Sequence, residues 1–521
     1  MNVLLSLLQK STDYNQLLKA VEAKQADAVS GLSQAPRSHV LAAAHEQSGR
    51  PLVAVCQDDM AAKRLASELG AFLGEEPPVL PSRELTLAGA IGVSRQWEQQ
   101  RLRLLYALAQ GRVPVLVASL DALLLRTLPR QTLFSASVTL RVGAEYSMPE
   151  LIERLTRAGY SRASLVEGVG QFALRGGILD VYSPAQEKPL RAEFFGDELD
   201  TMGYFDPITQ RRTENVDEAV LLPVAETEPH LHPQGISGLC EDLRAIIARQ
   251  QRRKTPNQAL IETLQKDCEA LENETLFASA DRYMALIYPE FTTAASYLPQ
   301  EAIVAFCDHG NLQRGEKDRA EEFGLLLDSF LSSGTLFGEL CDYYATMDDL
   351  AASLRGRAVI YCDSFLAARY PESLPPKQLL SFTARQLPGY GGSLETAAAD
   401  LKNYASNQYG SIVLCGGQRR GEILKELLAK SGLNALLSFP LTKLPQPGQI
   451  LIAGGSLPAG LEYPTLKFAI LTEGQIAVRQ ERKRVRAPKK ATNRKKLDSF
   501  TDLTPGDLVV HEHHGICLLY T

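Results

Sequence analysis

The sequence of 521 residues lacks any long apolar run. No stretch approaches the roughly 18 uninterrupted apolar residues that a membrane-spanning helix requires. The first five residues, MNVLL, do not resemble a secretory signal peptide, because no basic residue precedes the apolar ones. With 45% hydrophobic and 22% charged residues, the composition is that of a soluble globular protein. We therefore expect a cytoplasmic protein of about three or four domains with no membrane partner.

Cysteine pairs at a metal-binding spacing are also absent from the sequence. The eight cysteines are scattered along the chain, and none forms a Cys-x-x-Cys pair. Neither a zinc knuckle nor a disulfide framework is therefore indicated. We expect reduced thiols, no metal site and no disulfide.

Positive charge is scarce except in one segment. The net charge is −6, yet residues 479–496 carry ten basic residues against the single acid Glu481, so the segment contributes +9 and the rest −15. Pro488 and the lack of apolar periodicity predict a solvated linker over residues 477–499. Either this linker contacts the DNA backbone, or it is a hinge without a dedicated ligand. The basic residues in question include Arg482, Lys483, Arg484, Arg486, Lys489 and Lys490.

Short apolar runs alternate with helical patterns in two regions of the chain. Residues 51–56 and 115–119 read as buried strands, and each is followed by a helix. Residues 411–415, 450–453 and 468–471 show the same strand-like character. Alternation of this kind predicts parallel sheets covered by helices, and hence an α/β fold.

A degenerate nucleotide-binding motif precedes the first of these regions. Residues 31–38 keep the spacing of the G-x-x-x-x-G-K-[ST] phosphate loop, with Gly31 at the start and Ser38 at the end. Pro36 replaces the second glycine and has no N–H to offer a phosphate, and Arg37 replaces the compact lysine ammonium. We expect a loop scaffold, followed by a helix from His39, that no longer binds nucleotide. The alternative is that the spacing is accidental.

The region around residues 136–223 has β character. Residues 171–182 and 190–195 are strand-like, and Gly196-Asp197 is a hairpin signal. Because side chains alternate along a strand, Arg191, Glu193 and Phe195 share one face. An aromatic beside an arginine is typical of interface centres. The alternative is that Phe195 covers a neighbouring loop while Arg191 pairs with Glu193.

The order of these parts resembles a known family. Residues 170–181, 191–200 and 205–211 resemble the module that the excision-repair protein UvrB shares with the transcription-repair coupling factors (Mfd). Residues 503–516 look like the opening of the coupling factors' RNA-polymerase-interacting domain, and residues 92–102 fit as well. UvrB keeps a working phosphate loop, so Pro36 and Arg37 favour the coupling factors.

The resemblance implies a multidomain α/β fold. It predicts a degenerate P-loop (RecA/helicase-like) α/β domain with an inserted β-rich UvrA-binding domain, followed by a separate small α/β domain. The expected parts are residues 1–135 (domain 1a), 136–222 (domain 2), 223–355 (domain 1b), 376–476 (domain 3), 477–499 (basic linker) and 500–521 (truncated start of a CarD-like polymerase-binding domain).

The resemblance also implies the binding residues. In the family, the UvrA contact is made by an arginine before a glycine pair, an arginine preceding Phe-Phe, and the second of those phenylalanines. The matching positions are Arg175, Arg191 and Phe195, with Glu193 a weaker addition. The implied function is recruitment of UvrA to RNA polymerase stalled on damaged DNA.

The full-length family has activities that we do not expect here. Its members continue into an ATP- and magnesium-dependent motor that translocates on double-stranded DNA, and into a domain that masks the UvrA-binding face. The sequence shows no catalytic site and ends within the domain that would contact the polymerase β subunit, so we expect neither a cofactor nor an intact polymerase contact. The alternatives are a UvrB-like ATPase or helicase subunit, and a DNA-binding module that uses the basic linker.

Overall fold

The computed structural model describes residues 2–88, 96–273, 277, 279–365, 367, 369–390, 393–473, 508–511 and 515–518. Residues 1–476 form one compact unit and residues 477–521 a second. In the second unit the structure describes an antiparallel hairpin of β22 (Leu508–His511) and β23 (Gly515–Leu518). The predicted basic linker, including Arg482 to Lys490, lies outside the described residues.

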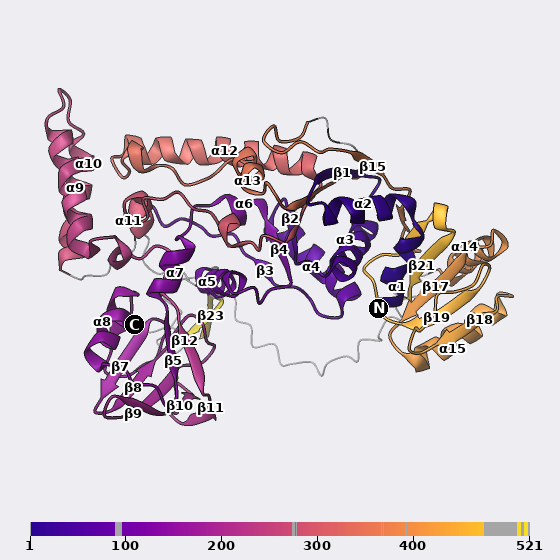
Figure 1. The fold of residues 1–521 in the computed structure, drawn as a ribbon, viewed down its shortest axis with the longest axis horizontal. Helices are drawn as coiled ribbons and strands as arrows, with labels where there is room; N and C mark the ends of the chain where they lie inside the picture. Colours follow the sequence, from indigo (N-terminus) through magenta and orange to yellow (C-terminus); the bar gives the residue numbers. More distant parts are fainter. Residues whose placement is uncertain are drawn as a thin grey trace, which may run out of the picture. The chain divides into compact units, whose positions relative to one another are not determined.

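A seven-stranded, fully parallel sheet forms the centre of the first unit, as the alternating pattern predicts (Figure 1). Its strands come from distant parts of the chain, because segments on both sides of the β-rich region contribute to it. In spatial order they are β15 (Leu379–Ser381), β1 (Ala26–Ser30), β14 (Ala358–Cys362), β13 (Ile303–Cys307), β2 (Leu52–Cys56), β4 (Val115–Ser119) and β3 (Val79–Leu80).

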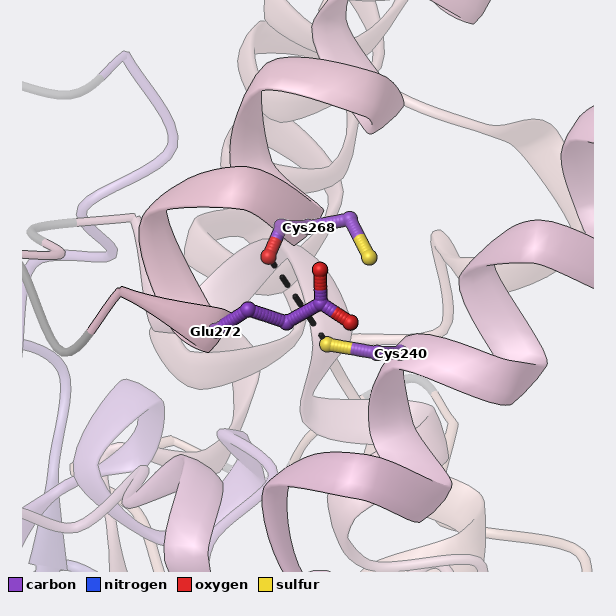
Figure 2. A group of neighbouring side chains, drawn as sticks. All are labelled: Cys240, Cys268 and Glu272. Carbon is purple, nitrogen blue, oxygen red and sulfur yellow. Dashed lines mark hydrogen bonds between the residues drawn. The ribbon is translucent and has the colours of Figure 1, made fainter.

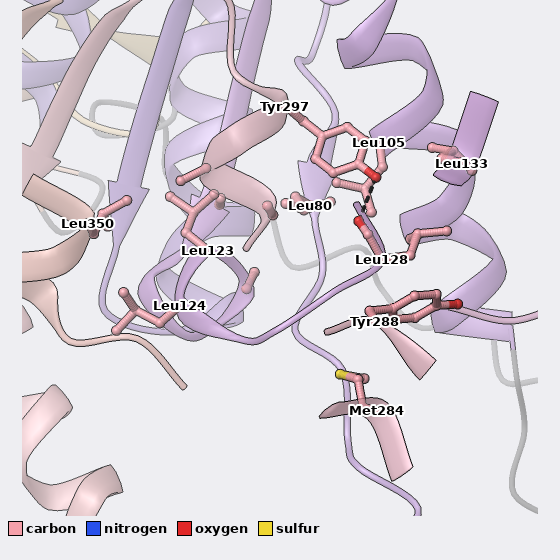
Figure 3. Packing of buried hydrophobic residues seen from close by; sticks show 14 of the residues in the cluster. Leu80, Leu105, Leu123, Leu124, Leu128, Leu133, Met284, Tyr288, Tyr297 and Leu350 are labelled. Carbon is pink, nitrogen blue, oxygen red and sulfur yellow. Dashed lines mark hydrogen bonds between the residues drawn. The ribbon is translucent and has the colours of Figure 1, made fainter. Parts of the chain in front are cut away.

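Each face of this sheet contributes to a separate hydrophobic core. Along β2, Val53 and Val55 belong to one core, whereas Leu52, Ala54 and Cys56 belong to the other. This alternation is what a strand buried on both faces requires. Figure 3 shows part of the first core, in which the Tyr297 hydroxyl also donates a hydrogen bond to the Leu128 carbonyl at 2.8 Å.

Helices cover both faces of the sheet and have identifiable ends. Helix α4, for example, starts after Asp58, whose side chain accepts from the Ala61 N–H at 2.7 Å, and ends at Gly74 in the left-handed conformation. The helices up to the β-rich region are α1 (Asn2–Ser6), α2 (Thr12–Glu22), α3 (Gln34–Ser48), α4 (Asp59–Leu73), α5 (Gln96–Ala109), α6 (Leu120–Leu124) and α7 (Arg130–Ala136). After that region follow α9 (Gly235–Gln251), α10 (Gln258–Glu272), α11 (Met284–Ile287), α12 (His309–Ser332) and α13 (Met347–Ser353).

The β-rich region folds into a six-stranded sheet with its own core. A two-stranded sheet of β5 (Val138–Arg141) and β12 (Glu218–Leu221) and the helix α8 (Met148–Arg157) contribute to the same core. The six strands are β11 (Arg212–Asn215), β10 (Glu198–Phe205), β9 (Leu190–Phe195), β8 (Ile178–Val181), β7 (Gln171–Arg175) and β6 (Ser161–Arg162).

A second six-stranded sheet, called the third sheet below because it is the third with more than two strands, is built after residue 384 with helices α14 (Leu394–Ser406) and α15 (Gln418–Lys430). One of its faces has a core of its own, whereas Ile412 and Leu414 on the other face join the core that contains α3. The third sheet therefore packs against the N-terminal helices. Its strands, in spatial order, are β16 (Arg385–Gln386), β20 (Leu461–Tyr463), β21 (Phe468–Thr472), β17 (Gly410–Cys415), β19 (Ile450–Gly454) and β18 (Ala435–Ser438).

Among the helices that the structure describes, none combines the length and the apolar character of a membrane-spanning segment. The molecule is a mixed α/β protein with several sheets, as the sequence predicts.

Candidate functional site

The outer face of the six-stranded sheet gathers the three residues predicted to bind UvrA. In the antiparallel register, Arg175 lies opposite Ile178, Ile178 opposite Glu193, and Asp180 opposite Arg191. Directly opposed residues point to the same side of a sheet. The other side is apolar, since Leu179 and Ala192 are completely buried in the core. The predicted sharing of one face by Arg191, Glu193 and Phe195 is confirmed.

Asp180 fixes the two arginines of this face. Its side chain is 1% exposed and accepts two hydrogen bonds from Arg191, at 2.7 and 2.8 Å, and one from Arg175 at 2.9 Å. The Arg191 guanidinium also donates to Gln210 and lies 4.6 Å from the ring centre of Phe205. The hydrogen bonds to the Asp180 carboxylate raise the pKa of Arg191, although burial acts in the opposite direction. Both guanidinium groups are therefore held in place before any partner binds.

Phe195 projects from the end of β9 into solvent. It is 85% exposed and precedes a tight turn at Gly196, whose φ of +66° suits glycine. Phe195 therefore does not cover a neighbouring loop, and Arg191 pairs with Asp180 rather than with Glu193. Glu193 instead accepts a hydrogen bond from Arg212 at 3.2 Å. The alternative for this strand, in which Phe195 covers a loop while Arg191 pairs with Glu193, is wrong on both points.

The loop at residues 31–38, predicted to be a degenerate phosphate loop, is shorter than its sequence spacing predicts. Helix α3 begins at Gln34, with Ser33 before it, so Pro36, Arg37 and Ser38 lie inside the helix. The expectation of a loop up to Ser38 and a helix from His39 is wrong. The physical reason is that proline is well tolerated in the first turn of a helix, where its missing N–H would have no intrahelical partner.

Another segment of the chain covers this loop. A Cβ atom at Gly31 would lie 2.0 Å from the Phe382 carbonyl oxygen, so the backbone after β15 lies directly against the loop. The Ala35 N–H at the start of α3 donates to the Gln386 side chain at 3.3 Å. In a phosphate loop, such N–H groups would face the anion.

The side chains that would contact phosphate or magnesium have other partners. Arg37 is buried and forms an ion pair with Asp308 at 2.7 Å, and Ser38 donates to Glu68 at 2.5 Å. A cavity of about 180 Å³ beside them is lined by Arg37 and Arg64 but also by Asp58, Glu68 and Asp308. The cavity therefore has charges of both signs.

Comparison with known proteins agrees with the sheet geometry. Residues 138–226 match the family described as the UvrB interaction domain, a range that contains the whole six-stranded sheet. The transcription-repair-coupling factor of Staphylococcus aureus strain USA300 is 26% identical over 98% of this chain. That of Bacillus subtilis strain 168 is 24% identical over 98%. The predicted resemblance to the transcription-repair coupling factors is confirmed.

The chain spans less than half of these relatives. Each alignment covers 43% of the coupling factor's length. The resemblance therefore describes the part of a coupling factor that carries the UvrB interaction domain.

Two features of the molecule were not predicted from its sequence. The first is Asp180, which accepts hydrogen bonds from both arginines. In the sequence it is visible only as a single acid between Leu179 and Val181, whose side chains lie on the opposite, core-facing side of the strand. The structure also brings Cys240, Cys268 and Glu272 together on α9 and α10, although 27 residues separate the two cysteines. No Cys-x-x-Cys motif could reveal this second grouping, because it depends on how two helices pack.

Proposed function

We propose that this chain acts in transcription-coupled nucleotide-excision repair by recruiting UvrA through the outer face of its six-stranded sheet. The observation that carries the proposal is the exposed Phe195 beside the fixed guanidinium groups of Arg175 and Arg191. The match of residues 138–226 to the UvrB interaction domain and the similarity to coupling factors support it.

The physical character of the face suits a protein partner. An exposed aromatic beside arginines is the composition of binding hot spots. Because Asp180 already orders Arg191 and Arg175, little side-chain entropy is lost when a partner binds. Ile178, which is 38% exposed, adds apolar surface between Arg175 and Glu193.

The test is the affinity of UvrA for the whole chain and for Phe195→Ala. Truncating a central interface aromatic typically costs about 2 kcal/mol or more, which corresponds to roughly 30-fold weaker binding. We expect a loss of this size, measured by calorimetry or biolayer interferometry. Arg175→Ala should also weaken binding.

Phe365→Ala is the matched control. Phe365 is 88% exposed and follows β14, well away in sequence from the UvrB interaction domain. We expect this variant to bind UvrA like the unaltered chain. Equal affinity of the unaltered chain, Phe195→Ala and Arg175→Ala would refute the proposal.

We further propose that the loop at residues 31–38 does not bind nucleotide. The covering of Gly31 by Phe382, the hydrogen bond from Ala35 to Gln386 and the ion pair of Arg37 with Asp308 support this. A UvrB-like ATPase is accordingly the weaker alternative. In this proposal, ATP and magnesium belong to the motor of the longer coupling factors.

The remaining partners follow from the resemblance alone. Contact with the RNA polymerase β subunit and translocation on double-stranded DNA are proposed for a complete coupling factor. The DNA-binding alternative for this chain depends on the basic residues between Arg482 and Lys490, and it predicts binding that weakens steeply with salt.

A further inference from the structure

Two cysteines and a glutamate converge where α9 and α10 pack together (Figure 2). Cys240 comes from α9, and Cys268 and Glu272 come from successive turns of α10. Their two sulfur atoms and a carboxylate oxygen all lie within 4.8 Å of one another. The Cys240 thiol also donates a weak hydrogen bond to the Cys268 carbonyl at 3.8 Å. Residues four apart on a helix share a face, so both α10 side chains can reach the same point.

These donors have the chemistry of a soft-metal site. Thiolates select zinc-class cations, and zinc also accepts a carboxylate oxygen as a ligand. With zinc–sulfur bonds of about 2.3 Å in a tetrahedron, neighbouring sulfurs lie about 3.8 Å apart. The two sulfur atoms, which lie within 4.8 Å, would need to approach by at most about 1 Å, which side-chain rotation can supply.

We propose that Cys240, Cys268 and Glu272 form a binding site for a soft divalent cation of the zinc class, with water as the fourth ligand. A bound cation would join α9 to α10 at the end of the helical pair opposite its connecting turn. This inference is independent of the proposed UvrA binding, because none of its residues lies between 138 and 226.

Burial gives the site a closed side and an open side. Cys240 is fully buried and Cys268 is 6% exposed, whereas the Glu272 side chain is 44% exposed. A cation can therefore enter from solvent past Glu272 and reach the two sulfurs behind it.

Arg244 competes with the cation for the Glu272 carboxylate. It lies one turn after Cys240 on α9 and forms an ion pair with Glu272, and its side chain is 54% exposed. The guanidinium can swing into solvent when a cation takes its place. Removing its charge should therefore tighten metal binding.

Binding should strengthen as pH rises. A metal binds the thiolate, so it must displace the thiol protons, and each proton released makes the affinity pH-dependent.

The test is a cobalt(II) titration of the whole chain with a phosphine reductant present. Cobalt reports thiolate ligands by a sulfur-to-metal charge-transfer band and tetrahedral geometry by strong visible bands. We expect saturation at one cobalt per chain, displacement by zinc, and an affinity that is higher at pH 8 than at pH 6.5.

Substitutions assign the ligands. Cys240→Ser and Cys268→Ser should each abolish the charge-transfer band, and Glu272→Gln should weaken binding by about 10-fold or more. Arg244→Gln should bind more tightly than the unaltered chain. Cys341→Ser is the matched control, because Cys341 is a half-buried thiol outside the group, and it should leave the titration unchanged.

Two results would overturn the proposal. One is the absence of a charge-transfer band at saturating cobalt in the unaltered, folded chain. The other is a band that survives Cys240→Ser, because the metal would then sit on other thiols. Since Glu272 and Arg244 are exposed enough for their variants to fold, a cobalt affinity unaffected by both would exclude the carboxylate as a ligand.

Discussion

Asp180 decides how the arginines of the candidate UvrA-binding face behave. It is nearly inaccessible to solvent, yet it accepts hydrogen bonds from both Arg175 and Arg191. A buried carboxylate needs such partners, because an unpaired buried charge is costly. Replacing either arginine therefore changes the stability of the sheet as well as its surface. Phe195 has no such role, because it is 85% exposed.

Substitution of Asp180 should separate positioning from contact. In Asp180→Asn both guanidinium groups lose charge-assisted hydrogen bonds, which contribute about 1.5–3 kcal/mol each at most. We expect the free energy of unfolding to fall by about 1–3 kcal/mol and UvrA to bind more weakly. Urea denaturation and UvrA titration of the same preparation measure the two effects.

Phe195→Ala is the comparison for that experiment. It should weaken UvrA binding while the unfolding midpoint stays unchanged, because little surface of Phe195 is buried. If Asp180→Asn leaves both stability and binding unaltered, the hydrogen bonds to Arg175 and Arg191 do not organise the face.

The sequence could predict this face only in part. Alternation along a single strand places Arg191, Glu193 and Phe195 on one side without any knowledge of the neighbours. The contribution of Asp180 depends on the register between β8 and β9, and that of Arg212 on the register between β10 and β11. Register is set by turns and packing across strands, which a one-strand pattern does not contain.

At the scale of elements, the loop after β1 could also be predicted from the sequence only in part. From the sequence, Pro36 and Arg37 predict only that this loop has lost its phosphate-binding chemistry. That the segment containing Phe382 and Gln386 covers the loop is invisible in the sequence, because about 350 residues separate the two.

Nucleotide titration tests whether the loop at residues 31–38 is inaccessible to ATP. Because the Ala35 N–H and the Arg37 guanidinium already have partners, we expect no saturable ATP binding to the unaltered chain below about 1 mM, which corresponds to about −4 kcal/mol. Fluorescent ATP analogues or calorimetry with magnesium present would measure it. Saturable binding in the micromolar range would contradict the proposal.

A variant in which the phosphate-loop residues are restored tests which feature of the loop prevents ATP binding. The double variant Pro36→Gly/Arg37→Lys recovers the residue types of the phosphate loop. We expect it to bind no ATP either, because Phe382 and Gln386 still cover the loop. If it gains micromolar affinity, the two substitutions alone explain the loss of binding and the covering segment does not.

At the scale of the whole molecule, distant segments share one core. The alternating pattern predicts an α/β fold, but it cannot give the order of strands, since β2 pairs with β13 about 250 residues later. His39 illustrates the result: its ring contacts the Leu4 carbonyl at 3.0 Å and the Tyr463 hydroxyl at 2.9 Å. One buried ring thus connects α1, α3 and the third sheet.

Two buried histidines make the stability of this unit depend on pH. Burial lowers the pKa of His39 to about 4 and that of His309 to about 4 as well. Between about pH 6.5 and pH 4 the unfolded chain binds a proton at each histidine while the folded chain does not. The free energy of unfolding should therefore fall as pH decreases through this window, by up to about 3 kcal/mol per histidine.

His309→Phe should remove the contribution of His309 to the pH dependence of the unfolding free energy. The ring of His309 lies among Phe306, Tyr361 and Tyr370, and neither of its nitrogens has a hydrogen-bond partner among the described residues. A phenyl ring fits these contacts and has no unpaired polar atom, so stability at pH 7.5 should be kept or raised. Urea denaturation at pH 7.5 and pH 5 should then show a smaller loss of unfolding free energy for His309→Phe than for the unaltered chain.

His39→Phe, which loses its contacts to Leu4 and Tyr463, should instead be less stable at pH 7.5. The other titratable side chains are the same in all three proteins, so an equal loss in His309→Phe and the unaltered chain would show that His309 is not buried in its neutral form.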